Sequence, residues 1–297
     1  MFIARVFRGV LAVVLLLSFV LIINECAVAC SSKRTKDIPY IAPDAAGFDA
    51  ERNRLDVYEP KKKGDVPYPV VVFIHGGGWD SGSKNIYGFI GRRLAKQGVV
   101  AVIINYRLAP AVEVPRMADD CARAVLWTQQ HIAQYGGDPN RIFVMGHSAG
   151  GGLAALLAAD NRFFSKLGVT QNPVKGAILD DPAGLDMFDY LNKMEYPDDQ
   201  KYLVPFGKEP AVWRAMSALY HINAGSPPML VFVGERTYPG IARSTRKFRD
   251  RLEELGVKHE FKLLPGKKHI PMVLQLFWKN NVIYRDLLQL VGATSAT

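Results

Sequence analysis

The chain has 297 residues, of which 49% are hydrophobic and 22% charged, and its formal net charge is +9. This length and apolar content suffice for one large domain with a substantial core and leave little room for a second full domain. Despite the positive charge, the sequence contains no nucleic-acid-binding motif and no ligand spacing typical of a metal site, so we expect neither partner.

The first 29 residues are typical of an export signal. Arg5 and Arg8 precede an apolar run at 10–23, and small residues precede Cys30. The tract is similar to a bacterial lipoprotein signal, in which this cysteine is lipidated. Cleavage after Ala29 without lipidation and an uncleaved amino-terminal anchor are the alternatives. We therefore expect a protein of the bacterial cell envelope or periplasm that is held at the membrane by a lipid on Cys30.

Residues 30–50 are expected to form a polar tether, and residues 51–297 a single domain. Buried apolar strands alternate there with helices, which indicates the α/β class with a mostly parallel central sheet covered by helices on both faces. The strands are predicted at 54–58, 70–74, 99–104, 142–145, 175–180, 229–233 and 259–264. The helices are predicted near 84–97, 115–134, 149–160, 241–255 and 270–290. Cys121 stands alone on one of these helices, so no disulfide framework is expected.

A G-x-S-x-G motif at 146–150 lies between a predicted strand and a predicted helix. In this setting, a serine on a sharp turn exposes its hydroxyl at the carboxyl edge of the sheet. The motif predicts that Ser148 is a nucleophile. The alternative is a glycine-rich turn that merely needs small residues.

A second glycine-rich segment, His75-Gly76-Gly77-Gly78-Trp79, follows the predicted strand at 70–74. Consecutive glycines free backbone N–H groups to point at a developing oxyanion, and HGGG-type loops are paired with G-x-S-x-G turns. His75 is expected to hold this loop by hydrogen bonding rather than to act as a base. A flexible turn after a strand is the alternative interpretation.

Together with Asn105-Tyr106-Arg107-Leu108-Ala109-Pro110 and the segment 136–142, these motifs resemble those of α/β-hydrolases. The similarity is to carboxylesterases of the hormone-sensitive-lipase-like and isoprenylcysteine-methylesterase-like groups, and it runs from about residue 53 to about residue 290. This resemblance implies a lid-like excursion between the sixth and seventh strands, where the aromatic-rich stretch 186–225 lies. A long irregular surface connection is the alternative.

The resemblance also implies a set of catalytic residues. The N–H groups of Gly77, Gly78 and Ala149 would bind the oxyanion, and His269, after the last strand, would be the general base. Related sequences commonly place an aspartate three residues after the glycine that ends the seventh strand, where this chain has Thr237.

The identity of the triad acid is therefore open. Glu235 is the leading choice because it lies close to the expected position. Asp180 or Asp181, at the end of the sixth strand, and the absence of any functional acid are the alternatives. Losing the orienting carboxylate of a serine triad can lower turnover by about four orders of magnitude.

These residues predict a serine hydrolase that cleaves small carboxylic esters through an acyl-enzyme and needs no cofactor. One alternative is an amide-cleaving hydrolase of the arylformamidase or peptidase type. Another is an envelope lipoprotein that uses a hydrolase scaffold without turnover.

Removing Arg5, Arg8 and Glu25 with the signal lowers the net charge to +8. A surface this basic suits anionic lipid headgroups or acidic substrates, or is simply the solvated surface of an exported protein.

Overall fold

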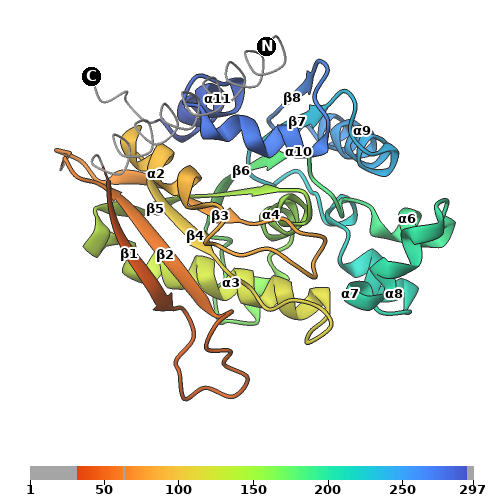
Figure 1. Cartoon of the computed structure of the whole chain (residues 1–297), viewed down its shortest axis with the longest axis horizontal. Helices are drawn as coiled ribbons and strands as arrows, with labels where there is room; N and C mark the ends of the chain where they lie inside the picture. Colours follow the sequence, from red (N-terminus) through yellow and green to blue (C-terminus); the bar gives the residue numbers. More distant parts are fainter. Residues whose placement is uncertain (1–31, 63, 293–297) are drawn as a thin grey trace, which may run out of the picture.

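A computed structural model describes residues 32–62 and 64–292. Its centre is an eight-stranded sheet with the order β1-β2-β4-β3-β5-β6-β7-β8 (Figure 1). The six strands β4, β3, β5, β6, β7 and β8 pair in parallel. Strand β2 is antiparallel to both of its neighbours, β1 and β4. The bounds of the strands are β1 Ser32–Pro39, β2 Arg54–Pro60, β3 Tyr68–Ile74, β4 Val100–Ile104, β5 Gly137–His147, β6 Val174–Asp180, β7 Met229–Gly234 and β8 His259–Leu264.

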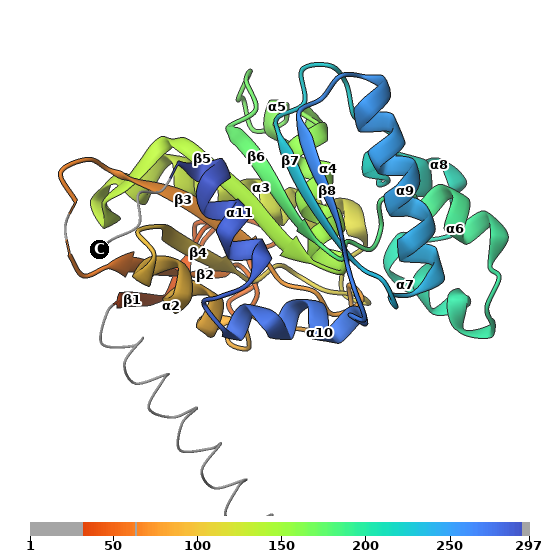
Figure 2. The same ribbon diagram turned by 90° about the horizontal axis from the view of Figure 1, so that it is seen from above.

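Helices cover both faces of the sheet, as the alternating pattern predicted (Figures 1 and 2). One face carries α3 (Val114–His131), α4 (Ala149–Ala159) and α9 (Pro239–Glu254). The other carries α2 (Gly88–Lys96), α10 (His269–Leu274), the 3-10 turn η4 (Gln275–Phe277) and α11 (Val282–Val291). The strands in the middle of the sheet are almost wholly apolar because they are buried on both faces.

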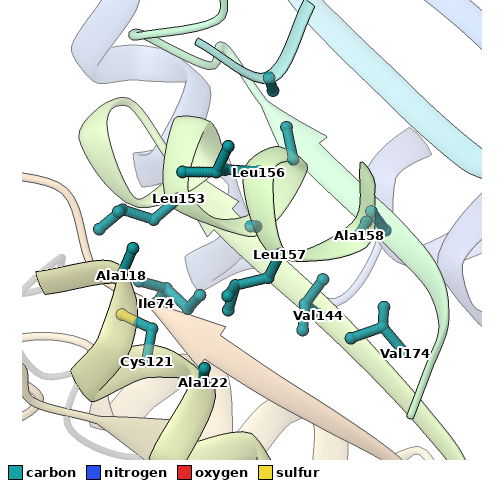
Figure 3. Packing of buried hydrophobic residues seen from close by; sticks show 14 of the residues in the cluster. Ile74, Ala118, Cys121, Ala122, Val144, Leu153, Leu156, Leu157, Ala158 and Val174 are labelled. Atoms are coloured by element: carbon teal, nitrogen blue, oxygen red, sulfur yellow. The ribbon is translucent and has the colours of Figure 1, made fainter. Parts of the chain in front are cut away.

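Helix α4, which follows the G-x-S-x-G motif, is the most enclosed helix of the described part, since all of its residues are buried. Leu153 and Leu157 lie among side chains of α3, β3 and β5 (Figure 3). Cys121 of α3 belongs to this cluster as a free, fully buried cysteine. A helix that is apolar all round in this way is held by packing on every side, so the turn that precedes it is anchored in the core.

Two predicted elements are wrong in detail. The expected tether at 30–50 contains the edge strand β1, which is fastened to β2 by Arg34–Asp56 at 2.5 Å and joined to buried Lys84 through Asp37. Lys84 also pairs with the fully buried Asp56 at 2.8 Å. The expected helix at 270–290 is two helices, because the chain turns between them and Asn281 caps α11 by accepting the Tyr284 N–H at 2.9 Å.

The excursion between β6 and β7 folds into short helices beside α9 (Figure 2). They are α6 (Met187–Lys193), η2 (Pro197–Tyr202), α7 (Leu203–Phe206), α8 (Pro210–Ala215) and η3 (Ala218–Tyr220). The short helix α5 (Arg162–Ser165) lies earlier, between α4 and β6. A further 3-10 turn, η1 (Ile132–Tyr135), extends α3. Within the described part of the chain, no helix is long and apolar enough to cross a membrane.

Candidate active site

Ser148 lies on the turn between β5 and α4, with φ 56° and ψ −126°. A non-glycine residue with positive φ is strained and persists only where the surroundings impose it. Here they do, because a Cβ on Gly150 would lie 2.1 Å from the carbonyl oxygen of Ile74 and one on Gly146 would lie 2.2 Å from that of Gly150. Glycines at both positions let the turn pack directly on β3, which aims the Ser148 hydroxyl out of the sheet edge.

His269 is the first residue of α10 and lies beside the serine. Its Nε2 atom accepts a hydrogen bond from Ser148 Oγ at 2.8 Å. This is the nucleophile–base distance that general-base activation of a serine requires. The structure therefore brings together the two residues that sequence analysis placed at the centre of the site.

The carboxylate that contacts His269 belongs to Asp181. Its Oδ2 accepts the Nδ1–H of His269 at 2.6 Å, and its Oδ1 accepts the N–H of Gly234 at 2.8 Å. Asp181 follows directly on β6 and has φ 48°, while its own N–H donates to the carbonyl of Phe232 at 2.8 Å. The turn at the end of β6 is thus clamped to β7, and this clamp directs the fully buried carboxylate toward the histidine.

The expected contact between Glu235 and His269 is wrong. The Glu235 carboxylate instead accepts the N–H of Gly266 at 2.6 Å, on the turn after β8. Thr237, at the position where an aspartate was expected, donates its hydroxyl hydrogen to Asp181 Oδ2. The chain therefore keeps a polar group at the end of β7, but that group supports a carboxylate supplied by β6.

Asp180, the other carboxyl group at the end of β6, does not reach the histidine. Its side chain is fully buried, and neither carboxyl oxygen has a hydrogen-bond partner among the described residues. Burial, together with the neighbouring Asp181, raises the pKa of Asp180 well above its usual value. Burial of this kind disfavours the charged form of a carboxyl group, and Asp180 makes no hydrogen bond to His269.

The glycine-rich loop after β3 borders the serine. Gly77 and Gly78 have φ values of 122° and 60°, which a residue with a side chain rarely adopts, and Gly78 lines the same pocket as Ser148. Ala149 follows the serine as the first residue of α4. The three backbone groups that sequence analysis expected to face an oxyanion therefore lie on the two segments that flank the nucleophile.

His75 holds this loop in place, as expected. Its Nδ1–H donates to the carbonyl of Gly76 at 2.7 Å, and its ring stacks on Tyr106 at a centroid distance of 4.5 Å. The Tyr106 hydroxyl donates to the His75 carbonyl at 2.9 Å. Burial lowers the pKa of His75 to about 4, so its ring is neutral.

His147, beside the nucleophile, has a positioning contact that the sequence did not reveal. Its Nε2–H donates to the backbone carbonyl of His269 at 3.1 Å, and the two rings lie 4.7 Å apart. Burial and the nearby His269 lower the pKa of His147 to about 3. His147, the residue between Gly146 and Ser148 in the motif, thus holds the start of α10 against the end of β5.

Ser148 and His269 line a pocket of about 290 Å³. Its walls include Trp79 and Tyr238 from loops of the core domain and Met187, Tyr190 and Tyr202 from the excursion. Trp79 meets Tyr202 edge-on at a centroid distance of 5.8 Å. The stretch at 186–225 therefore covers the site, as the lid interpretation predicted, with a mostly aromatic wall of the kind that receives apolar groups.

Two further expectations concerned metal binding and the lipidation of Cys30. Among residues 32–62 and 64–292, no cluster of histidine, cysteine and acidic side chains could hold a metal ion. Cys30, the expected lipidation site, lies outside the described residues.

The turn at Ser148 and the glycine-rich loop after β3 both lie in a segment that matches a known family. The family model named BD-FAE matches residues 55–239, which include both glycine motifs. The chain belongs to the BD-FAE family. The match ends before His269, so the base lies beyond the part that this family model covers.

Curated relatives of this BD-FAE member include two kinds of hydrolase. A probable isoprenylcysteine alpha-carbonyl methylesterase of Arabidopsis thaliana is 31% identical over 80% of this chain and 52% of its own length. A kynurenine formamidase of Danio rerio is 27% identical over 90% of this chain and 87% of its own. The chain spans only between 52% and 63% of the length of six curated plant and mycobacterial relatives.

Among solved structures, inhibited esterase B of Lactobacillus rhamnosis superposes with a TM-score of 0.74 at 21% identity. The superposition covers 97% of this chain and 96% of the other. The predicted α/β-hydrolase fold is thereby confirmed, including the mostly parallel sheet with helices on both faces. The predicted likeness to isoprenylcysteine methylesterases is confirmed as well.

Proposed function

We propose that the protein is a serine hydrolase that cleaves carboxylic esters through an acyl-enzyme. The observation that carries this proposal is the continuous hydrogen-bonded chain from Ser148 through His269 to Asp181 at the floor of an aromatic-walled pocket. Esterase relatives and an esterase of the same fold support it. The acid is assigned to Asp181 in place of Glu235.

In the first half of the proposed reaction, His269 Nε2 takes the proton of Ser148 Oγ as that oxygen attacks the ester carbonyl carbon. The N–H groups of Gly78 and Ala149, with Gly77 beside them, stabilise the negative oxygen of the tetrahedral intermediate. Asp181 stabilises the protonated imidazole and keeps its Nδ1–H directed away from the serine. The histidine then gives its proton to the departing alcohol, which leaves the acyl group on Ser148.

In the second half, His269 takes a proton from a water molecule, and the resulting hydroxide attacks the acyl carbon. Collapse of the second tetrahedral intermediate breaks the acyl–Oγ bond, and the proton returns from His269 to Ser148. The carboxylic acid leaves and the enzyme is restored. No cofactor takes part in these steps.

The test is hydrolysis of p-nitrophenyl butyrate by purified protein, together with labelling by a fluorophosphonate probe. Wild-type protein is expected to hydrolyse the ester and to be labelled. Ser148→Ala is expected to lose labelling and nearly all turnover while remaining folded by circular dichroism. Equal turnover by wild type and Ser148→Ala contradicts the assignment of the nucleophile. Absence of labelling in folded wild-type protein favours a non-catalytic scaffold instead.

Cleavage of an amide by the same residues is the second candidate function, favoured by the similarity to a kynurenine formamidase. A matched pair of p-nitrophenyl butyrate and an N-formyl aniline separates the two. An ester-to-amide ratio of kcat/KM well above one supports the esterase. A preference for the formamide supports the second candidate, and Ser148→Ala must abolish either activity.

We further propose that the protein is exported and anchored in the bacterial envelope through a lipid on Cys30. The support is the basic, apolar and small-residue order of residues 1–29. Metabolic labelling with an alkyne fatty acid in a bacterial host tests this anchor. Cys30→Ser is expected to lose the label, and Cys26→Ser, four residues earlier in the signal, is expected to keep it.

A further inference from the structure

An exposed apolar surface lies beside the active-site histidine. It consists of Ile86, Phe89, Ile270, Leu274 and Trp278, and we call it the α2–α10 surface. Four of these side chains are more than half exposed: Ile86 at 63%, Ile270 at 55%, Leu274 at 53% and Trp278 at 55%. Large apolar side chains that gather on one face mark an interaction site more often than scattered ones do.

Contacts between α2 and η4 join the aromatic residues of this surface. The rings of Phe89 and Phe277 lie 5.8 Å apart, and the ring of Trp278 lies 5.3 Å from that of Phe277. Arg93 Nε donates to the carbonyl of Phe277 at 2.8 Å, which fixes η4 against α2. Figure 2 shows α2 and α10 on the same side of the sheet.

The residues on α10 complete the surface. Ile270 and Leu274 are four residues apart, so they share one side of the helix. His269, the first residue of α10, directly precedes Ile270. The apolar surface therefore reaches the rim of the active site.

The charged residues of the two segments that form this surface are all basic. Neither residues 81–97 nor residues 266–285 contain an aspartate or a glutamate. These two segments, which form α2, α10, η4 and the start of α11, carry Lys84, Arg92, Arg93, Lys96, Lys267, Lys268, Lys279 and Arg285. Of these, Lys96, Lys268, Lys279 and Arg285 are exposed, but Arg285 pairs with Asp286 at 2.9 Å. Lys84 is buried and pairs with Asp37 and Asp56. The cationic border is therefore formed by Lys96, Lys268 and Lys279. An apolar centre with a cationic border is complementary to a bilayer that contains anionic lipids.

We propose that the α2–α10 surface docks on an anionic phospholipid membrane. Trp278 and the two aliphatic side chains of α10 enter the headgroup boundary, where tryptophan is favoured, and the lysines contact lipid phosphates. A second copy of the chain fits this surface less well, because a two-fold interface would bring the same cationic border against itself. The inference does not depend on the chemistry of Ser148.

The position of β1 agrees with this orientation. Ser32, the first described residue, begins an edge strand that contacts α2 (Figure 1). A lipid on Cys30 would therefore attach the chain beside α2, at the edge of the sheet opposite to His269. Docking would hold the rim at His269 close to the bilayer, where esters of membrane-dissolved alcohols or acids are concentrated.

The test uses the fluorescence of Trp278 in the full chain, because vesicle binding alone could arise from residues 1–31. Trp79 and Trp213 are buried at 3% and 6% exposure. The partly exposed Trp127 lies on α3, on the other face of the sheet, so Trp278 is the accessible reporter on this face. Protein is mixed with vesicles of phosphatidylglycerol and phosphatidylcholine, or of phosphatidylcholine alone, with brominated acyl chains as quenchers. Trp278→Phe defines the background from the other tryptophans.

The expected result is a blue shift and quenching that require both Trp278 and phosphatidylglycerol. Ile86→Glu/Leu274→Glu is expected to lose the quenching, and Lys268→Glu/Lys279→Glu to reduce it to the level seen with phosphatidylcholine alone. Val66→Glu/Leu263→Glu, which changes two equally exposed apolar residues elsewhere, is the matched control and is expected to behave like wild type. Circular dichroism shows whether each variant is folded.

Three outcomes overturn the proposal. One is wild-type protein that binds vesicles without any quenching of Trp278. Another is quenching that is the same in the control and the α2–α10 variants. The third is a concentration-dependent dimer that buries Trp278 without lipid, since this would identify a second copy of the chain as the occupant.

Discussion

Thr237 donates a hydrogen bond to Oδ2 of Asp181, the same oxygen that accepts the Nδ1–H of His269 at 2.6 Å. With the N–H of Gly234 on Oδ1, the carboxylate is held by three donors, two of which come from the end of β7. The residue that stands where an aspartate was expected therefore positions an aspartate from the neighbouring strand. This relationship explains how the site retains a triad although the expected acid is missing.

Thr237→Val removes that donor with little change in volume. Hydrogen bonds to charged groups contribute about 1.5–3 kcal/mol, so we expect kcat to fall about 10- to 100-fold. KM should change little, because the threonine bonds to the carboxylate rather than to the substrate. Thr237→Ser keeps a hydroxyl and should recover most of the turnover. Equal losses in the two variants would contradict the role of the hydroxyl group.

Asp181→Asn should show which carboxylate serves the histidine. The amide leaves His269 without its anionic partner, and we expect kcat to fall by about four orders of magnitude. Asp180→Asn and Glu235→Gln are the matched controls and should stay within about threefold of wild type, since neither carboxyl group contacts the histidine. Steady-state hydrolysis of p-nitrophenyl butyrate measures all three. A large loss in Glu235→Gln alone would restore the assignment made from sequence.

The pH dependence of stability should change when Asp180 is removed. His75 and His147 have native pKa values of about 4 and about 3, below the unfolded value of 6.5, so acid favours the unfolded state. Each histidine contributes a loss of about 2 kcal/mol between pH 7.5 and pH 5. Asp180 has a raised native pKa, so its contribution has the opposite sign and stability increases as pH falls toward 3.8.

In Asp180→Asn the opposing contribution is absent. We therefore expect its free energy of unfolding to fall by about 4 kcal/mol between pH 7.5 and pH 5, the sum of the two histidine contributions. The wild-type free energy of unfolding should fall less over the same range. Urea unfolding at a series of pH values gives both profiles. Parallel curves for the two proteins would show that Asp180 does not hold its proton in the native state.

Gly150→Ala should be strongly destabilising, because its Cβ would lie 2.1 Å from the carbonyl oxygen of Ile74. Neither the core helix nor the strand can move away without loss of packing, so we expect a cost above about 3 kcal/mol. Gly225→Ala, in an exposed loop where the nearest atom belongs to a side chain, is the control and should be nearly neutral. Thermal unfolding and soluble yield distinguish the two.

The sequence predicted the parts of the molecule that depend on local patterns. Buried apolar runs located the central strands, and the glycine spacing located Ser148 and the loop at Gly77 and Gly78, because each of these is encoded within a few consecutive residues. The edge strand at Ser32–Pro39 was missed because its residues are mostly polar. Its pairing depends on Asp56 and Lys84, which are distant in sequence.

Sequence analysis named Asp180 or Asp181 only as an alternative to Glu235, for a related reason. Asp180 and Asp181 are neighbours with the same side-chain chemistry, but Asp180 ends β6 and Asp181 begins the turn that follows, so their side chains lie in different environments. The choice between them depends on the positive φ of Asp181 and on its hydrogen bonds to Gly234 and Thr237, which are made only in the folded chain. The contact from His147 to the His269 carbonyl has no local signal either.

The location of the acid directly after β6 also has a consequence for how the specificity of this protein can change. Ser148 and Asp181 follow adjacent, hydrogen-bonded strands, and the Ser148 N–H donates to the Asp180 carbonyl at 3.2 Å. The turn from Glu235 to Tyr238 therefore does not supply the carboxylate that contacts His269, although Tyr238 lines the pocket. Mutations at Tyr238 can therefore alter which substrates are accepted without removing the charge on which catalysis depends, whereas Thr237 remains linked to turnover through its hydrogen bond to Asp181.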